Sequence, residues 1–190
     1  MTDAETSLSE HAWTIRHAAP ADLDTIVGFN VAMAKETEAL DLPIDTARAG
    51  VQMVLEARVS AAAYFVLELP AADPPASTPV SAAGGAPSSG GAGQQVPQRV
   101  VAAQLMITKE WSDWRARDIW WVQSVYVRPE YRRRGLFKAL YRHVRAEAEA
   151  AGAAGVRLYT DTGNQRSHSA YEGLGMTSHY KVYEDMFTHY

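Results

Sequence analysis

The sequence contains no cysteine, and this absence excludes a disulfide framework, a zinc ribbon and a cysteine nucleophile. It also lacks an apolar run of the roughly 18–20 residues that a membrane-spanning helix needs. The first residues, MTDAETSLSEHAW, have neither the basic start nor the apolar stretch of a secretory signal. We therefore expect a soluble, cytoplasmic protein without a membrane partner, whose chemistry uses groups other than thiols.

The chain also has no overall excess of positive charge, since its formal net charge is −4. This charge argues against a general nucleic-acid-binding protein. Basic residues are nevertheless crowded into one short stretch, namely Arg128, Arg132, Arg133, Arg134, Lys138, Arg142 and Arg145. This local excess requires its own explanation.

The composition, with 47% apolar and 21% charged residues over 190 positions, predicts one α/β domain that can bury a core. Residues 70–98 hold six of the nine prolines and hardly a large apolar side chain, so we expect a disordered insert. The insert separates two strand-like runs, residues 64–69 and 100–107, and we interpret it as an enlarged hairpin connection. The prediction is a single domain over residues 1–190, with residues 1–12 flexible. A linker between two domains is the alternative.

Hydrophobic spacing and turn residues predict a mixed α/β order of elements around one central sheet. Strands are expected at residues 14–17, 64–69, 100–109, 119–127, 156–160 and 180–187. Helices are expected at residues 20–34, 46–58, 135–152 and 166–172.

The helix expected to begin near Gly135 has an inverted charge pattern. Its basic residues cluster at the N-terminus, where the helix dipole disfavours cations, and its acids come towards the end. The inversion is sensible if an anion binds there, because free backbone N–H groups, the dipole and the arginines all attract it. A solvated basic turn is the alternative. Since the Walker spacing and a GxGxxG fingerprint are both absent, another phosphate-bearing ligand is indicated.

This turn also carries a family resemblance. The segment VYVRPEYRRRGLF at residues 125–137 resembles the acyl-CoA-binding motif of the GNAT superfamily of N-acetyltransferases, Gln/Arg-x-x-Gly-x-Gly/Ala. Arg132 and Gly135 match the motif, whereas Phe137 departs from its usual small residue. The larger side chain of Phe137 affects how closely the backbone can approach the pyrophosphate. The backbone N–H of Phe137 is still available to bind it.

Further segments resemble the same superfamily. Residues 164–176, NQRSHSAYEGLGM, resemble its second signature, and residues 15–18 with Asp22 resemble its opening strand and helix. The segments EWSDWR at residues 110–115 and QSVYV at residues 123–127 resemble one branch of the superfamily.

The resemblance implies the GNAT fold, a central mixed, splayed β-sheet flanked by helices, with acetyl-CoA as co-substrate. Pantetheine would lie between the splayed strands, and a backbone N–H of that strand would meet the oxyanion. The residues that the resemblance places around the cofactor are Val125, Tyr126, Val127, Arg132, Arg133, Arg134, Gly135, Leu136, Phe137, Lys138 and Asn164. For Asn164, capping the following helix is an additional or alternative role.

The implied reaction is direct attack of an amine on the thioester. A lysine-like amine, with a pKa of about 10.4, is mostly protonated at neutral pH, so a base or a water chain is needed. Glu110 is our first choice as general base; Glu36, Glu38 and Asp113 are candidates for binding a cationic acceptor, although each could be a solvated surface acid. Tyr171 occupies the family's general-acid position and would protonate the departing thiolate; a purely packing tyrosine is the alternative.

Two other residue types attract attention. Trp111, Trp114, Trp120 and Trp121 could surround an alkyl-ammonium by cation–π attraction, but such residues are more often core or dimer contacts. The histidines have no metal-ligand spacing, so we expect no metal.

The expected function is N-acetylation of a small-molecule amine with acetyl-CoA. A protein acetyltransferase acting on lysine or an N-terminus is the closest alternative, and a non-catalytic acyl-CoA-binding sensor is a third. A homodimer stays open.

Overall fold

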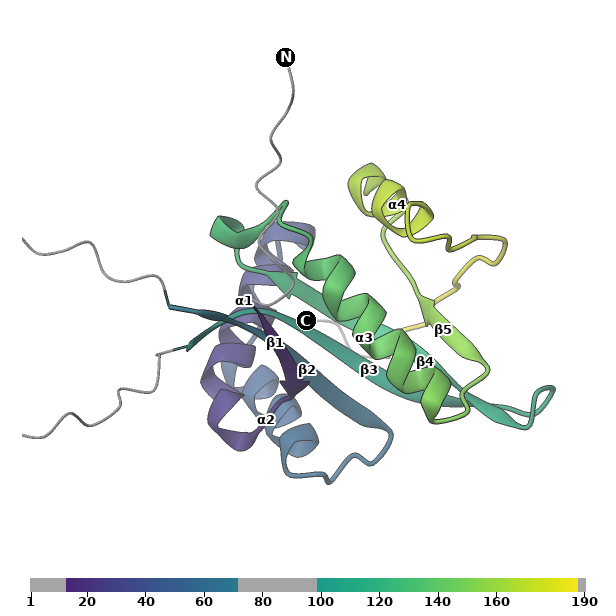
Figure 1. Cartoon of the computed structure of the whole chain (residues 1–190), viewed down its shortest axis with the longest axis horizontal. Helices are drawn as coiled ribbons and strands as arrows, with labels where there is room; N and C mark the ends of the chain where they lie inside the picture. Colours follow the sequence, from purple (N-terminus) through teal and green to yellow (C-terminus); the bar gives the residue numbers. More distant parts are fainter. Residues whose placement is uncertain (1–12, 72–98, 188–190) are drawn as a thin grey trace, which may run out of the picture.

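The computed structural model describes residues 13–71 and 99–187, which build one five-stranded sheet with helices on both faces (Figure 1). The strands are β1 (Thr14–His17), β2 (Ala62–Pro70), β3 (Arg99–Ser112), β4 (Arg117–Val127) and β5 (Gly155–Leu158). The α-helices are α1 (Leu23–Glu38), α2 (Ile44–Leu55), α3 (Leu136–Ala150) and α4 (Gln165–Glu172), and two short 3₁₀ turns are η1 (Pro20–Asp22) and η2 (Pro129–Tyr131).

The strands lie side by side in sequence order, β1-β2-β3-β4-β5. The first four are antiparallel neighbours, and β5 joins parallel to β4 after the crossover through α3. This is the mixed sheet that the sequence predicted.

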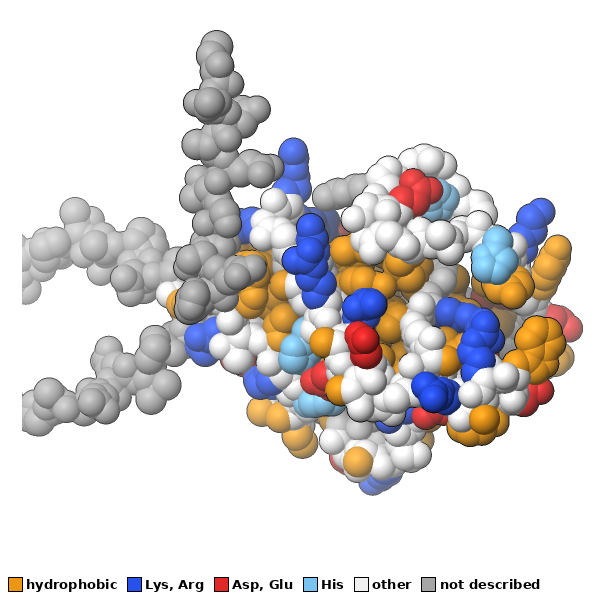
Figure 2. Space-filling model, turned by 45° about the vertical axis from the view of Figure 1, so that its right-hand side comes forward, with side chains coloured by type: hydrophobic (Ala, Val, Ile, Leu, Met, Phe, Trp, Pro, Cys, Tyr) orange, Lys and Arg blue, Asp and Glu red, His pale blue; other side chains and the backbone are white. Residues whose placement is uncertain are grey.

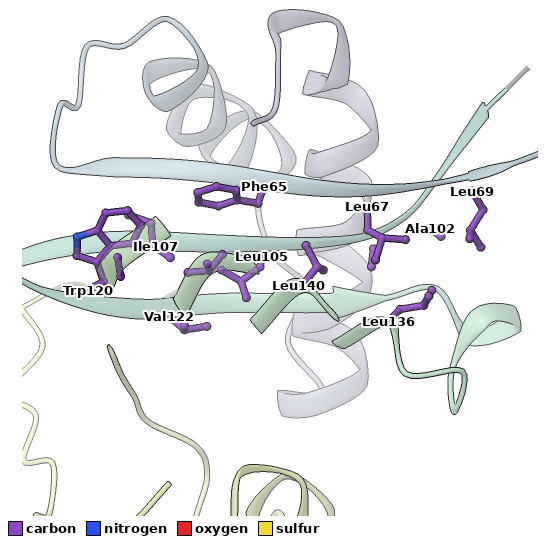
Figure 3. Packing of buried hydrophobic residues seen from close by; sticks show 13 residues of the cluster. Phe65, Leu67, Leu69, Ala102, Leu105, Ile107, Trp120, Val122, Leu136 and Leu140 are labelled. Atoms are coloured by element: carbon purple, nitrogen blue, oxygen red, sulfur yellow. The ribbon is translucent and has the colours of Figure 1, made fainter. Parts of the chain in front are cut away.

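The core consists of two apolar layers, one on each face of the sheet. On one face, α3 packs its Leu136 and Leu140 onto strand residues that include Phe65 and Leu105, and all four side chains are almost completely buried (Figure 3). On the other face, α1 and α2 bury a smaller cluster around Ile26. A fully buried leucine or isoleucine contributes roughly 1.5–3 kcal/mol, so these layers fix the sheet between its helices.

A bulge in β4 decides which side chains share a face. Met106 pairs with Ser124 and Ile107 pairs with Val122, so Gln123 has no partner in β3. Because of this extra residue, paired side chains of β3 and β4 point to the same face both before and after the bulge. The face towards α1 therefore carries Gln104, Met106, Thr108 and Glu110 of β3 beside Ile119, Trp121, Ser124 and Tyr126 of β4.

The two parallel strands separate, as predicted. Pairing of β4 with β5 ends at Val122 and Leu158, and β4 continues to Val127. Within the described chain, residues 123–127 have no partner strand on the side of β5. Apart from the carbonyl oxygen of Val127, which accepts from Arg132, their backbone groups on that edge are therefore available to a ligand.

An ion-pair cluster fastens the start of the chain to the sheet. The Arg16 guanidinium binds both carboxylate oxygens of Asp22, at 2.7 and 3.0 Å, and also Glu68 of β2. Asp22 is buried and accepts a further hydrogen bond from Ala19 N at 2.7 Å. Burial raises the pKa of Asp22, but these hydrogen bonds and the charge of Arg16 outweigh it and hold the pKa below its usual value.

We expect Asp22→Asn to lower the free energy of unfolding by roughly 1–3 kcal/mol at neutral pH, because Arg16 loses a charged partner. Since the pKa of Asp22 is depressed, its contribution is complete above the unfolded value near 4 and is lost as pH falls through the folded value. Thermal unfolding at neutral and acidic pH measures this. The difference between the variant and the wild type should shrink on acidification; a constant difference would contradict the prediction.

Residues 180–187 do not form the predicted strand, because no ladder joins them to β5, and Tyr183 and Phe187 are 89% and 94% exposed. The predicted insert lies outside the described residues from position 72, as do residues 1–12, but Pro70 belongs to β2 and pairs with Arg99. The strands on either side of residues 72–98, β2 and β3, are antiparallel neighbours in the sheet. Within the described ranges, no helix has the length and apolar character to cross a membrane.

Candidate functional site

The turn between β4 and α3 exposes a row of backbone amides. Arg133 has φ of 63° and Gly135 has φ of 81°, so the chain enters the left-handed region twice within three residues. Gly135 is the N-cap of α3 and supplies no capping side chain, and the first turn of the helix has no acidic residue. Backbone N–H groups arranged in this way form a concave anion site that the helix dipole reinforces.

The side chains around these amides are cationic and available. In the described part of the chain, no carboxylate forms an ion pair with Arg133, Arg134 or Lys138. Arg134 stacks over the Tyr131 ring, 5.4 Å from its centroid, while Arg128 pairs with Glu130 at 2.9 Å. Arg133, Arg134 and Lys138 thus place positive charge at a helix N-terminus without a carboxylate partner among the described residues.

Arg132, the motif arginine, faces the protein. Its Nε donates to the carbonyl oxygen of Val127 at 2.8 Å, and its NH2 group donates to Glu36 Oε2 on α1 at 2.6 Å. The side chain therefore holds the turn against the end of β4 and against α1. Arg132 was predicted to bind the cofactor. In this structure its side chain contacts Val127 and Glu36, and through these contacts it shapes the turn.

Glu36, a predicted acceptor-binding acid, is engaged by two donors. Besides Arg132, the Tyr126 hydroxyl donates to Glu36 Oε1 at 2.9 Å. Burial raises the pKa of Glu36, but the hydrogen bonds from Arg132 and Tyr126 prevail and keep its pKa below the usual value. Glu36 is thus held as a carboxylate that links α1 to the splayed strand and the basic turn, and it is poorly suited to accept a proton.

The other predicted acids lie farther along the same side of the molecule. Glu38 is exposed at the end of α1, and Asp113, in the turn after β3, accepts from Trp114 N at 2.8 Å. Glu110 binds the indole N–H of Trp121 and lies 3.6 Å from Arg157. Glu110 is four residues along β3 from Met106, the partner of Ser124, which corresponds to roughly 13 Å. The structure places Glu110 on the face towards α1 but not beside the end of β4.

The helix α4 carries the remaining predicted residues. Asn164 caps it, because its side-chain oxygen accepts from Ser167 N at 3.1 Å; this confirms the capping role and leaves the side-chain amide hydrogens for another partner. Tyr171 packs edge-on against Phe137 of α3, with ring centroids 5.7 Å apart. Burial raises the pKa of Tyr171, partly offset by a hydrogen bond with Ser167, so the phenol stays protonated at neutral pH. The structure thus brings Tyr171 next to the basic turn.

The shape of this region is visible on the molecular surface. Figure 2 shows α4 standing apart from the body of the molecule, with hydrophobic side chains between them. Leu136 is buried beneath the turn, whereas Phe137 is half-buried and available to a ligand. The free edge of β4 at Val125 and Val127 completes the group of predicted cofactor residues.

The tryptophans divide into two groups. Trp120 is buried in the core, and Trp121 lies under Arg157, 5.7 Å from its guanidinium carbon. Trp111 and Trp114 are 64% and 88% exposed, so they do not lie in the core, and the dimer contact stays a prediction for these two. No group of three or more His, Cys, Asp or Glu side chains suited to a metal ion occurs among the described residues.

The sequence reasoning missed a buried polar network beneath α1. Gln104 is completely buried and donates to Asn30 Oδ1 at 2.6 Å, and Asn30 donates to the Tyr64 hydroxyl at 3.2 Å. Two buried atoms, Gln104 Oε1 and Ser124 Oγ, have no hydrogen-bond partner within the described chain. One signal was present in the sequence: Gln104 is the single polar residue in the apolar run of residues 100–107.

Comparison with known proteins identifies relatives of this arrangement. Residues 91–176 match the model of the Acetyltransferase (GNAT) family. No curated protein matches the chain. A solved structure described as a possible acetyltransferase from Clostridium difficile 630 is 33% identical, with a TM-score of 0.72, over 94% of this chain and 99% of the other.

More distant structures share the fold. A ribosomal-protein-alanine N-acetyltransferase from Brucella melitensis biovar Abortus 2308 is 14% identical, with a TM-score of 0.62, over 93% of this chain and 100% of its own. An aminoglycoside N-acetyltransferase in complex with CoA is 16% identical, with a TM-score of 0.63, over 92% of this chain and 93% of its own.

Proposed function

The chain belongs to the GNAT family of acetyltransferases, and from this premise we propose that it transfers the acetyl group of acetyl-CoA to a primary amine of a small molecule. The observation that carries the proposal is the turn of residues 132–138. Left-handed backbone at Arg133 and Gly135, an uncapped helix N-terminus and unpaired cations together suit a pyrophosphate. The aminoglycoside N-acetyltransferase, which has the same fold, was solved with CoA bound.

In the proposed complex, the free edge of β4 hydrogen-bonds the pantetheine arm. The backbone at Val125 would donate and accept, and Val127 would donate its N–H, because its carbonyl oxygen already accepts from Arg132. The amide hydrogens of Asn164 would reach the arm from α4. A backbone N–H of Tyr126 or Val127 would stabilise the oxyanion. No metal is required for this chemistry.

The proposed reaction forms a carbon–nitrogen bond and breaks the carbon–sulfur bond of the thioester. The amine attacks the carbonyl carbon, and its surplus proton passes to a base or to water. Tyr171 gives its phenolic proton to the departing thiolate and is afterwards reprotonated by solvent. Glu110, still our candidate base, would need a water chain, because it lies roughly 13 Å along the sheet from Ser124.

The acceptor is proposed to be small and cationic in solution. Glu38, Glu110 and Asp113 supply negative charge that attracts an ammonium group, whereas Glu36 is already paired with Arg132. A protein substrate is the other candidate, since the Brucella relative in fold is a ribosomal-protein-alanine N-acetyltransferase.

Release of the CoA thiol in the presence of acetyl-CoA tests the proposal. The acceptors to be compared in this assay are n-butylamine, spermidine, tyramine, kanamycin, a peptide with N-terminal alanine and a lysine peptide; they are called the panel below. We expect turnover with a small amine. Turnover with peptides alone would favour the protein substrate, and binding of acetyl-CoA without any turnover would favour the sensor.

Arg133→Ala should weaken acetyl-CoA binding several-fold at low salt and less at high salt, because screening already removes part of the attraction at high ionic strength. Arg142→Ala is the matched control, since Arg142 is an exposed arginine one turn beyond Lys138 on α3. Calorimetric titration at two salt concentrations measures both. An equal loss for the two variants would assign the effect to overall charge rather than to the turn.

A further inference from the structure

The buried network beneath α1 contains two polar atoms that the protein leaves without partners. Gln104 is 0% exposed, and its Oε1 has no hydrogen-bond partner among the described residues; the same holds for the buried Oγ of Ser124. A buried acceptor without a hydrogen bond costs roughly 1–3 kcal/mol. Two such atoms close together therefore indicate a group that binds there.

The sheet register brings the two residues together. Gln104 pairs with Tyr126, and Met106 pairs with Ser124, so Gln104 and Ser124 are diagonal neighbours on the same face, with backbones roughly 7 Å apart. Both side chains lie on the face of the sheet towards α1. Gln104 is held in place because its amide nitrogen donates to Asn30.

The location fits the proposed reaction. Ser124 lies two residues beyond Val122, where β5 leaves β4, and immediately before Val125 on the free edge. It also borders an open part of the face, because the neighbouring Gln123 is exposed while Gln104 and Tyr126 are buried. A group bound at Ser124 would stand beside the strand proposed to hold the thioester.

We propose that Gln104 Oε1 and Ser124 Oγ bind the nucleophilic nitrogen of the acceptor as a neutral primary amine. The inference rests on the proposed function. A neutral primary amine has two N–H hydrogens, one for each oxygen, and this leaves its lone pair free for the thioester carbonyl. A secondary amine has one hydrogen and satisfies only one of the two atoms.

The surrounding titratable groups agree with a neutral occupant. Tyr64 accepts from Asn30, Tyr126 donates to Glu36, and Glu36 is neutralised by Arg132. None of these contacts leaves a carboxylate free beside Gln104 and Ser124. An ammonium ion would lose its hydration without gaining a counter-charge, so the site favours the amine after its proton has been released.

Ser124→Ala is the principal test, because it removes one oxygen without altering the network of Gln104. The kinetic probe is the panel amine with the fastest turnover, compared with the same compound carrying one N-methyl group. We expect kcat/KM for the primary amine to fall about tenfold, and the preference for the primary over the N-methyl amine to shrink. The KM for acetyl-CoA should not change. Ser112→Ala, at a buried serine near the tip of β3, is the matched control and should leave the preference intact.

A second measurement needs no acceptor. Because the Ser124 hydroxyl has no internal partner, Ser124→Ala should leave the melting temperature unchanged or raise it. A fall of several degrees would show an internal role and overturn the inference. An unchanged preference in folded Ser124→Ala and in Gln104→Met, normalised to folded protein, would also overturn it. Failure of the proposed function is seen separately, as absence of turnover by the wild type, and the amine site would fall with it.

Discussion

Gly135→Val should abolish tight binding of acetyl-CoA, with a loss of about 100-fold or more. Gly135 has φ of 81°, a conformation that costs a residue with a side chain roughly 1–2 kcal/mol and is worse for a β-branched one. A Cβ at this position meets no atom within 4 Å, so backbone conformation rather than a clash is the cause. The valine would shift the turn and misalign the amides, and losing two charge-assisted hydrogen bonds of roughly 1.5–3 kcal/mol each accounts for the loss.

Gly152→Val is the matched control for this experiment. Gly152 follows the other end of α3, has φ of 74° and also has no atom within 4 Å of a built Cβ. Both variants should lower the melting temperature by a similar amount, but only Gly135→Val should lose acetyl-CoA in calorimetric titrations. Wild-type affinity in Gly135→Val would place the cofactor elsewhere, whereas a loss in both would point to general destabilisation.

The sequence predicted this turn because its signals are local. The inverted charges, Gly135 and the strand that ends just before Pro129 all lie within one short stretch, and the structure has a strand, a turn and a helix there. The splay of β4 from β5 was likewise implied by a motif on contiguous residues. Local patterns of this kind depend little on the rest of the fold.

Other features depend on contacts that no local pattern specifies. Residues 180–187 contain tyrosine, valine and phenylalanine, which are common in strands, yet a strand exists only where a neighbour accepts its hydrogen bonds. No such neighbour occurs among the described residues. Glu36 was predicted to be free for an acceptor, but Arg132, which lies 96 positions later, occupies it. The distance from Glu110 to the end of β4 follows from the register of β3 against β4. The role of Gln104 could be inferred only from the positions of Asn30 and Ser124 near it.

Tyr171→Phe should reduce turnover by about 10²–10⁴-fold while the protein stays folded and binds acetyl-CoA. The substitution keeps the ring and its edge-on contact with Phe137, and it deletes only the hydroxyl that we propose as general acid. Because burial raises the pKa of Tyr171, the wild type should lose activity on the basic side only above about pH 10. This basic limb should change in the variant, because the group that titrates there is gone.

Tyr141→Phe is the control that separates chemistry from packing. Tyr141 is a buried tyrosine on α3 whose ring also contacts Phe137, with centroids 6.3 Å apart. Tyr141→Phe therefore removes a hydroxyl from a second tyrosine that packs against the same phenylalanine as Tyr171. Turnover per folded molecule and melting temperature should be measured on one preparation of each variant. A general acid at Tyr171 predicts lost turnover at nearly constant melting temperature in Tyr171→Phe, and near wild-type turnover in Tyr141→Phe. The opposite pattern in Tyr171→Phe, a lower melting temperature with preserved turnover, would make it a packing residue and leave water as the proton donor.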